Sequence, residues 1–249
     1  MAKRLTCPPG QNNLIHTLPR DDRALLEPHL KQVILERGFV LEEPDQAIAL
    51  VYFPTSGVGS TVAFTDTGRL IEVGLFGNEG MSGTPVTLQA SHSPHQSFMQ
   101  VAGEGFAIDA STLRTLLDQN PTLQRHLLRY VQVMITQTSQ TALSNGQSKL
   151  EERLARWLLM CHDRTRGDIM ELTHEFLSVM LGVRRAGVTV AIHLLEGKGL
   201  IRANRGQIII LDRHELEDLA QSAYGTSEAE YARLIGFSPA ENVEKTEQR

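Results

Sequence analysis

Residues 172–202 read LTHEFLSVMLGVRRAGVTVAIHLLEGKGLIR, and this stretch decides the fold of the C-terminal third of the chain. Thr173 is a residue type that caps helix N-termini, so a short helix is predicted over residues 174–181. Gly182 tolerates the positive φ of a tight turn between helices. A second helix is predicted over residues 184–197, because apolar residues recur on one of its sides: Val188, Ile192 and Leu195. Two helices joined by such a turn are typical of a helix-turn-helix.

The flanking residues complete a winged helix. An apolar helical stripe precedes the motif and is formed by Leu150, Leu154, Trp157, Leu158 and Cys161. A short strand is predicted over residues 169–172. After the second helix, residues 199–202 and 207–211 form a predicted hairpin, and Asp212 caps a closing helix that runs through Leu219. The order helix, strand, helix, turn, helix, hairpin is that of a winged helix-turn-helix.

The start of the second helix carries the main candidate residues for DNA binding. In a helix-turn-helix the second helix lies in the major groove, and its first residues reach the base edges. An arginine there can donate two hydrogen bonds to O6 and N7 of guanine. We expect Arg185 to contact a base and Arg184 to contact a phosphate or a base.

Further contacts are expected around these two arginines. Thr173 begins a helix whose free N–H groups suit a phosphate, and Thr189 and His193 lie on the outward face. Ala186 and Gly187 belong to the same first turn, and the glycine serves close approach to either the first helix or DNA. The hairpin would contribute phosphate contacts as the wing, through Arg202 and Arg205.

The charge of the chain is unevenly distributed. The net charge of −5 at pH 7 argues against a generally nucleic-acid-binding surface. Residues 145–215, however, contain 11 Lys and Arg against 9 Asp and Glu, whereas the segments on either side are acidic. This distribution fits an acidic sensor that carries a DNA-facing module.

Short apolar runs separated by glycine and proline fill residues 31–108, where the helical period is almost absent. Strands are predicted over residues 31–35, 38–41, 48–53, 58–65, 70–76, 98–102 and 105–108. Their spacing predicts an antiparallel β-roll of the jelly-roll or cupin-like kind, preceded by a short helix near residues 21–30. The fold class is therefore α+β.

A long helix is predicted after Pro121, because residues 122–145 contain neither glycine nor proline and would span about 36 Å. Two apolar lines run along it, which predicts burial on two sides. The first is Leu123, Leu127, Tyr130 and Met134, and the second is Leu128, Val131, Ile135, Thr138 and Ala142. One line would pack on the roll and the other on a partner chain, and we assign the dimer contact to the first line. The alternative is a helix buried within one chain. Asn145 and Gly146 indicate a helix end or hinge.

The chain therefore divides into a sensor roll (residues 1–120), a dimerisation helix and hinge (121–146), a winged helix-turn-helix (147–222) and an acidic tail (223–249). A short helix is a candidate within the tail, near residues 228–235. The rest of the tail is polar, and we expect it to be largely flexible.

Residues 150–219 resemble the DNA-binding domain of the bacterial Crp–Fnr regulators. The resemblance is carried by residues 172–173, 181–185, 194–201, 206–208 and 212, and the order of the elements extends it to about residues 12–220. It implies a cytoplasmic homodimer that binds double-stranded DNA at a palindromic operator and regulates transcription, rather than an enzyme. RNA polymerase and a small-molecule effector remain open as further partners.

The sequence departs from the family pattern at the recognition helix. The family often has Ser-Arg-Glu-Thr-Val-Ser/Gly-Arg where this chain has residues 184–190, RRAGVTV. Arg185 retains the first arginine, but Ala186 replaces the acidic base reader and Val190 replaces the second arginine. We therefore expect a different operator, with more dependence on DNA shape.

The effector site implied by the resemblance also departs from the family. Cyclic-nucleotide-binding members use a Gly-Glu-Leu segment for the ribose and an Arg-Ser/Thr-Ala segment for the cyclic phosphate. The corresponding positions here are Gly83 and Thr84, followed by His95 and Gln96, so that both the glutamate and the arginine are missing. We expect an unknown effector at this pocket. A cyclic-nucleotide-responsive regulator with a divergent pocket is the alternative.

Composition excludes several other classes. No run of about 18 apolar residues is present, so no membrane span is expected. Two cysteines, Cys7 and Cys161, cannot hold an iron–sulfur cluster that needs four thiolates. His92 and His95 lack the further ligands of a metal, haem or cupin-type catalytic site. We therefore expect no cofactor and no metal.

Overall fold

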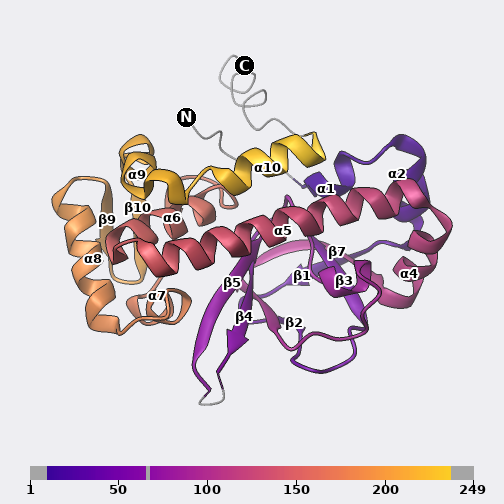
Figure 1. Cartoon of the computed structure of the whole chain (residues 1–249), viewed down its shortest axis with the longest axis horizontal. Helices are drawn as coiled ribbons and strands as arrows, with labels where there is room; N and C mark the ends of the chain where they lie inside the picture. Colours follow the sequence, from indigo (N-terminus) through magenta and orange to yellow (C-terminus); the bar gives the residue numbers. More distant parts are fainter. Residues whose placement is uncertain (1–9, 66–67, 237–249) are drawn as a thin grey trace.

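The computed structural model describes residues 10–65 and 68–236, with a β-roll and a helical C-terminal half that lie next to each other along one long helix (Figure 1). Three short helices come first: α1 (Asn13–His16), α2 (Arg20–Leu26) and η1 (Glu27–His29). The strands of the roll are β1 (Lys31–Leu35), β2 (Val40–Glu42), β3 (Leu50–Pro54), β4 (Val58–Phe64), β5 (Leu70–Phe76), β6 (Gln96–Val101) and β7 (Gly103–Asp109). The predicted strands are thus confirmed with small shifts at their ends.

The roll consists of two antiparallel sheets. Their strand orders are β1-β7-β3 and β2-β6-β4-β5. A short helix, α3 (Thr84–Thr87), lies between β5 and β6, and α4 (Ala110–Gln119) leads from β7 to the long helix. Alternate strand residues face the interior, so the roll builds a core around Val51, Phe53, Met81 and Ile108, which α1 and α4 extend.

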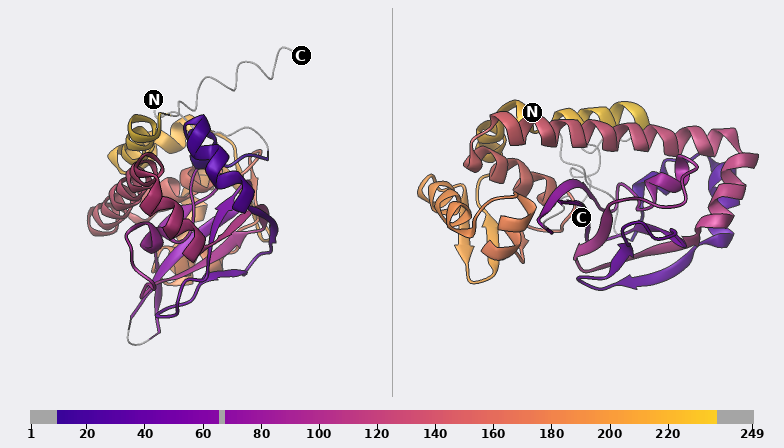
Figure 2. Two further views of the ribbon diagram at one scale, coloured as in Figure 1. Left: turned by 90° about the vertical axis from the view of Figure 1, so that its right-hand side faces the viewer. Right: turned by 60° about the horizontal axis from the view of Figure 1, so that its bottom comes forward.

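The long helix α5 (Pro121–Gln147) begins at Pro121 as predicted and runs the length of the molecule (Figure 2). Its first apolar line faces inward: Leu123, Leu127 and Tyr130 are at most 1% exposed. These three residues belong to the core of their own chain, and the partly buried Met134 packs against the same core. The assignment of this line to the dimer contact is therefore wrong, because the roll already covers it.

The helix break lies slightly later than the sequence indicated. α5 continues through Asn145 and Gly146 to Gln147, and α6 (Leu150–His162) begins after Ser148 and Lys149. The Glu152 carboxylate accepts a hydrogen bond from Lys149 N at 2.9 Å, which caps the new helix. The turn at Ser148 therefore separates the long helix from the DNA-binding domain.

The C-terminal domain has the predicted winged order. It comprises α6, β8 (Ile169–Met170), α7 (His174–Met180), α8 (Arg185–Gly197), β9 (Ile201–Asn204), β10 (Gln207–Ile210), α9 (Arg213–Ala220) and η2 (Gln221–Ala223). The three strands form a small antiparallel sheet in the order β8-β10-β9. Trp157 of α6, 3% exposed, contributes to a core that also contains Val58, Val62 and Leu75 of the roll. The two domains therefore share one hydrophobic core.

The segment after residue 222 is not a free tail over its described part. α10 (Thr226–Ile235) packs along α5, as the two ribbons show in Figures 1 and 2. Tyr231, 1% exposed, donates a hydrogen bond to Glu79 O at 2.9 Å. The short helix predicted near residues 228–235 is thus confirmed, and buried side chains hold it against α5 instead of leaving it in a flexible tail. Residues 237–249 lie outside the described ranges.

Candidate nucleic-acid interface

The two helices of the predicted helix-turn-helix are present and cross steeply. α7 and α8 are bent by 106° relative to each other, within the range of about 90–120° typical of this motif. The Thr173 hydroxyl accepts a hydrogen bond from Phe176 N at 3.2 Å and caps α7 as predicted. Gly182 has a φ of +63°, the left-handed conformation that the turn requires.

α8 holds one side against the domain and presents the other to solvent. Its buried residues are Val188, Ala191, Ile192 and Leu195. Its exposed residues near the start and middle are Arg184, Arg185, Ala186, Val190, His193 and Leu194. Since the buried side fixes the rotation of the helix, the exposed face is the one available to a DNA groove.

The two arginines stand at the beginning of this face. Arg184 is the residue before α8, and Arg185 is its first helical residue. Both are exposed, and neither guanidinium forms a salt bridge with another residue of the described ranges. Their donors are therefore available to phosphate or guanine oxygens.

Thr189 is more constrained than the sequence suggested. It is half-buried, and its hydroxyl donates to Arg185 O at 3.2 Å. The same hydroxyl lies 3.0 Å from Nδ1 of His174, the first residue of α7. A ring that donates from Nδ1 completes this arrangement. His174, which sequence reasoning did not single out, therefore links the two helices and orients Thr189.

Gly187 is explained by packing on α6. A Cβ atom at this position would lie 3.1 Å from Cδ2 of Leu150. The tight neighbour is the first residue of α6, rather than the first helix of the motif. Gly187 therefore allows α8 to approach α6 closely.

The wing presents two further arginines. Arg202 and Arg205 are exposed, on β9 and in the turn before β10 respectively. Gly206, with φ +77°, closes that turn. The Glu196 carboxylate of α8 accepts a hydrogen bond from Ala203 N at 2.7 Å. The wing is thereby tied to the recognition helix by a hydrogen bond.

The predicted effector residues lie on the roll, around α3 and the start of β6. Gly83 has φ +69° and donates its N–H to Glu42 Oε1 at 2.7 Å. Burial raises the pKa of Glu42, while the bonds from Gly83 and Ser97 oppose that rise. Thr84 begins α3. The N–H of Gly83 is thus already bonded to a carboxylate of the protein itself.

The other two predicted effector residues make local contacts. Gln96 Nε2 donates to Glu43 at 3.2 Å, and His95 Nδ1 lies 3.4 Å from the Ser93 hydroxyl. Neither of these residues, nor Gly83 or Thr84, lines the cavity of about 830 Å³ that lies between the roll and the C-terminal domain. The structure therefore places the large cavity away from the expected pocket.

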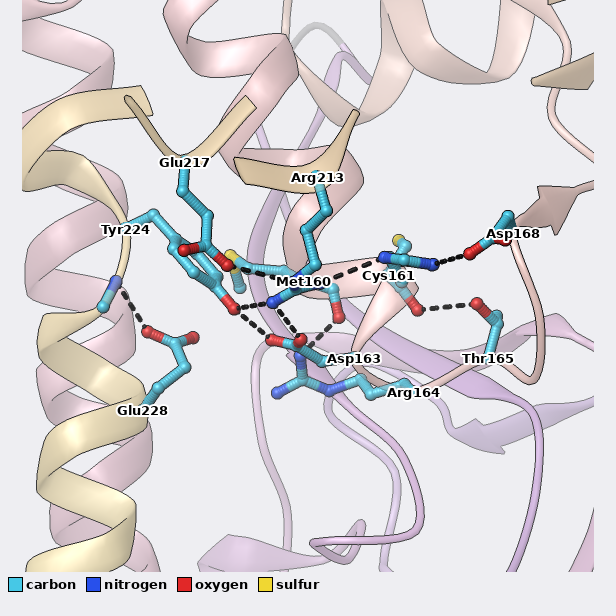
Figure 3. A network of polar contacts seen from close by, with 12 residues as sticks. Met160, Cys161, Asp163, Arg164, Thr165, Asp168, Arg213, Glu217, Tyr224 and Glu228 are labelled. Atoms are coloured by element: carbon cyan, nitrogen blue, oxygen red, sulfur yellow. Dashed lines mark hydrogen bonds and ion pairs between the residues drawn. The ribbon is translucent and has the colours of Figure 1, made fainter. Parts of the chain in front are cut away.

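Polar networks hold the DNA-binding domain together and join it to the roll. In Figure 3, Arg213 points between Tyr224 and Asp163. Its Nη2 donates to Asp163 at 2.7 Å and to the Tyr224 hydroxyl at 2.6 Å. The hydroxyl donates in turn to the second oxygen of Asp163 at 2.7 Å. Burial raises the pKa of Asp163 to about 7, although Arg213 opposes that rise.

Two buried contacts cross between the domains. Arg164 pairs with Glu79 at 2.7 Å, and both side chains are nearly inaccessible. Trp157 Nε1 donates to Glu72 of β5 at 2.8 Å, and the Ser60 hydroxyl donates to the other oxygen at 2.7 Å. Burial raises the pKa of Glu72 to about 7. Breaking one partner of such a buried pair is costly, so these contacts fix the relative position of the domains.

Within the described ranges, one exposed group of histidine and acidic side chains is compact enough to hold a metal ion. His214, Glu215 and Asp218 of α9 could bring ligand atoms within 4.8 Å of one another. Two loop histidines considered from the sequence, His92 and His95, instead contact neighbouring serines.

The comparisons with known proteins agree with this geometry. The family model of the Crp-like helix-turn-helix domain matches residues 152–219. Residues 152–219 therefore form a Crp-like helix-turn-helix domain. The helix-turn-helix domain that the sequence predicted is thus confirmed.

Several solved structures share the fold. A putative transcriptional regulator of the crp/fnr family from Eubacterium rectale has a TM-score of 0.67 at 18% identity, with 84% of this chain and 98% of that chain covered. FixK2 from Bradyrhizobium japonicum has a TM-score of 0.65 at 17% identity, with coverage of 78% and 98%. A transcriptional regulator of the CRP family from Thermus thermophilus has a TM-score of 0.64 at 16% identity, with coverage of 78% and 99%. No curated protein matches the sequence.

The described helices differ from membrane spans in length or in apolar character. Among the described residues, no single helix is both long enough and apolar enough to cross a membrane. The criterion is met only if α7 and α8 are taken together across their 106° bend. Those two helices form the helix-turn-helix.

Proposed function

We propose that this regulator acts as a homodimer on an approximately palindromic DNA operator, with the roll as its sensor. The observation that carries the proposal is the exposure of Arg184 and Arg185 at the start of α8, without a salt bridge to any described residue. Two copies of α8 related by a two-fold axis would enter successive major grooves, about 34 Å apart. Chromosomal DNA as the target places the protein in the cytoplasm.

The candidate contacts divide into base readers and phosphate contacts. Arg185 reads a guanine, and Arg184 contacts a phosphate or a base. Thr189, which His174 orients through a hydrogen bond, lies one helical turn after Arg185 and would contact a base edge. Contacts to the DNA backbone are expected from the start of α7, from α8 and from the wing: Thr173, His193, Arg202 and Arg205.

The second apolar line of α5 is the proposed dimer contact. Its members Leu128 and Ile135 are 39% and 55% exposed, and Leu143 on the same side is 44% exposed. Val131 of the same line is 6% exposed and Thr138 donates to Val73 O at 3.0 Å, so the contact is assigned to the exposed members alone. The opposite side of α5 is covered by the roll and by α10. A second copy of α5 packed against this line would remove these side chains from water.

The effector of the sensor is proposed to be something other than a cyclic nucleotide. A cyclic nucleotide would place its ribose at Gly83, whose N–H already donates to the Glu42 carboxylate, and its phosphate at His95 and Gln96, where the family arginine is missing. A cyclic-nucleotide-responsive regulator with a divergent pocket is the competing function. Calorimetric titration with cyclic AMP and cyclic GMP separates the two, since saturable binding of either nucleotide would favour the competing function.

The experiment that tests the proposal is in vitro selection of duplex DNA by the purified protein at several salt concentrations. We expect a two-fold symmetric site, with affinity that falls steeply as salt rises because phosphate contacts release counterions. Sedimentation in the absence of DNA should give a dimer. Selection of an asymmetric half-length site, or recovery of no enriched sequence, would contradict the proposal.

A further inference from the structure

The centre of the exposed face of α8 is apolar. Successive residues of a helix are rotated by about 100°, so that Ala186 and Val190 lie one turn apart on the same stripe. That stripe lies opposite Val188 and Leu195, which are fully buried. Val190 is 59% exposed, and Leu194 beside it is 47% exposed. Arg185 stands at the edge of this apolar strip.

The exposed apolar residues of α8 contribute little to the stability of the fold. Valine loses side-chain freedom in a helix and is a weaker helix former than the long polar residues usual at exposed positions. Burial of Val190 contributes little to the stability of the free protein, because most of its side chain is exposed to water. The apolar group that a major groove offers is the C5-methyl of thymine, which small apolar side chains contact.

We propose that Ala186 and Val190 form a methyl-binding strip that reads thymine beside the guanine bound by Arg185. This inference rests on the proposed function, since it requires α8 to enter the major groove. It predicts half-sites in which a G·C pair lies next to one or more A·T pairs whose thymine methyls face the helix.

Replacing thymine by deoxyuridine tests the strip, because this change removes only the C5-methyl group of one base. Each thymine of the selected half-site is replaced by deoxyuridine, one position at a time, and duplex affinity is measured by fluorescence anisotropy. We expect about four-fold weaker binding at each contacted position, the cost of exposing one methyl-sized group. Positions outside the strip should tolerate the change.

The protein side of the test is Val190→Ala. In this variant the deoxyuridine penalty should disappear at the position that Val190 contacts, because the methyl has lost its partner. Arg185→Ala and His193→Ala should weaken binding to the thymine and deoxyuridine duplexes alike and so keep the penalty, which makes them the matched controls. Placing 5-methylcytosine at that position should recover part of the affinity that cytosine loses, in the wild type only.

The outcomes distinguish the inference from the function on which it rests. Tight, sequence-selective binding that is indifferent to deoxyuridine at every position would overturn the methyl-binding strip and leave the proposed function intact. A penalty that persists unchanged in Val190→Ala would also overturn it. Failure to bind any duplex would instead contradict the proposed function.

A second, independent observation concerns the cavity between the domains. It has a volume of about 830 Å³ and is lined by residues 55–57 and 100–102 of the roll and by residues 163–167 and 169–171 of the C-terminal domain. Its volume falls within the range of about 300–1,000 Å³ that is usual for small-molecule sites, which favour domain interfaces.

One wall of the cavity contains a buried polar group that lacks a partner. Gln100 is 3% exposed, and its side-chain Nε2 has no hydrogen-bond partner, whereas Oε1 contacts the Ser60 hydroxyl. The Ser60 hydroxyl, which has one proton to donate, contacts both Gln100 Oε1 and Glu72, and Glu72 accepts from Trp157 of α6. A polar path thus runs from the cavity wall to the DNA-binding domain. An unsatisfied buried amide is costly, and a ligand group would remove that cost.

The mouth of the cavity carries both signs of charge. Arg37, Arg166, Glu104 and Glu171 line it and are exposed. None of the four forms a salt bridge within the part of the chain that the structure describes. A zwitterion can satisfy both signs at once, whereas a polyanion would meet two carboxylates.

We infer that the cavity between the domains binds a free amino acid or a zwitterion of similar size, through Gln100 and the charged mouth. Binding there would act on the domain interface directly, since both domains supply the walls. The site differs from the pocket around Gly83 and Gln96, which lies wholly within the roll.

The test is calorimetric titration of the full chain with each of the twenty amino acids, with DNA affinity as a second readout. At least one should bind saturably and change DNA affinity. Gln100→Met should weaken that binding at least ten-fold, and Arg166→Ala at the exposed mouth should weaken it in a protein whose fold is undisturbed. Gln96→Met on the same strand is the matched control.

Two results would overturn the inference. One is that no amino acid binds the wild-type protein at 10 mM (roughly the weakest affinity of use to a cellular sensor). The other is that Gln96→Met abolishes binding while Gln100→Met and Arg166→Ala retain it, which would move the site to the pocket in the roll.

Discussion

At the scale of single residues, Arg185 and Arg205 are both exposed arginines but have different surroundings. Arg185 begins a helix whose buried side fixes its direction, whereas Arg205 lies in the turn of the wing. A base is recognised by directional pairs of hydrogen bonds, while a phosphate is recognised mainly by charge. The two arginines should therefore contribute differently to specificity.

Arg185→Ala should weaken operator binding by about 1–3 kcal/mol and relax the preference at one base pair of each half-site. Arg205→Ala should weaken all sequences alike and reduce the slope of log affinity against log salt by about one. Both are measured by anisotropy titrations against the operator, its single-base variants and random duplex. An Arg185→Ala protein with an unchanged ranking of sequences would show that the base reader lies elsewhere.

Glu72 is a buried carboxyl whose ionisation is linked to domain docking. It accepts hydrogen bonds from Trp157 and Ser60, and burial raises its pKa to about 7 against the partly offsetting charges of Arg156 and Arg164. The folded protein therefore holds a proton at Glu72 between about pH 4.5 and pH 7, whereas the unfolded chain releases it. The contribution of Glu72 to the free energy of unfolding is therefore complete below about pH 4.5 and is lost as the pH rises from there to about 7.

Glu72→Gln should flatten the pH dependence of the free energy of unfolding. Glutamine can still accept from Trp157, but it cannot ionise. The wild type should lose up to about 1.4 kcal/mol per pH unit from this group between about pH 5 and pH 7, and the variant should lose less. Denaturant titrations across about pH 5–8 measure the difference, with the exposed Glu36→Gln as control. Parallel curves for wild type and Glu72→Gln would show that this carboxyl does not titrate in that window. Asp163, whose pKa is also about 7, would supply the residual slope.

At the scale of elements, α5 has two different sides. Leu127 and Tyr130 pack into the core of their own chain, whereas Leu128 and Ile135 are exposed. An exposed apolar line on a long helix favours association with another helix. The oligomeric state should therefore be sensitive to this line and insensitive to exposed apolar residues elsewhere.

Ile135→Glu should convert the dimer to a monomer, because a two-fold contact would bring two carboxylates together in an apolar seam. Its operator affinity should fall in parallel, since each half-site would bind alone. Sedimentation velocity measures the first effect, and anisotropy measures the second. Ile34→Glu is the matched control, because Ile34 is 75% exposed on β1. A monomeric Ile34→Glu protein with an intact Ile135→Glu dimer would place the interface on the roll.

The same elements show what the sequence could predict. Thr173 and Gly182 each carry a local signal, a helix cap and a left-handed turn, and the helix-turn-helix was confirmed where they placed it. The exposed side of α5 could not be predicted in this way. Both lines are apolar, and which of them the roll covers depends on contacts between segments far apart in the sequence. The hydrogen bond from Gly83 N to the Glu42 carboxylate could not be predicted for the same reason.

At the scale of the whole molecule, the chain joins the DNA-binding domain to the roll at two places. It enters that domain through the turn at Ser148 and returns through α10, which packs on α5 and reaches Glu79 O through Tyr231. The packing of α10 on α5 could not be predicted from the sequence, because α10 has few apolar positions and the residues around Tyr231 are polar. Rotation of the DNA-binding domain about Ser148 would therefore require α10 to slide or detach.

Tyr231→Ala should loosen the docked domain without unfolding the roll. The substitution removes a side chain that is 1% exposed, together with its hydrogen bond, and comparable deletions of large buried side chains cost about 3–5 kcal/mol. Hydrogen exchange should accelerate in α10 and in α6 around Trp157, while β3 and β7 of the roll keep their protection. Tyr231→Phe keeps the ring and loses only the hydroxyl, so it should show a small part of the effect, about 0.5–1.5 kcal/mol. Acceleration confined to α10 in Tyr231→Ala would mean that the contacts of Glu72 and Arg164 alone hold the two domains together, and that α10 has no part in restraining the turn at Ser148.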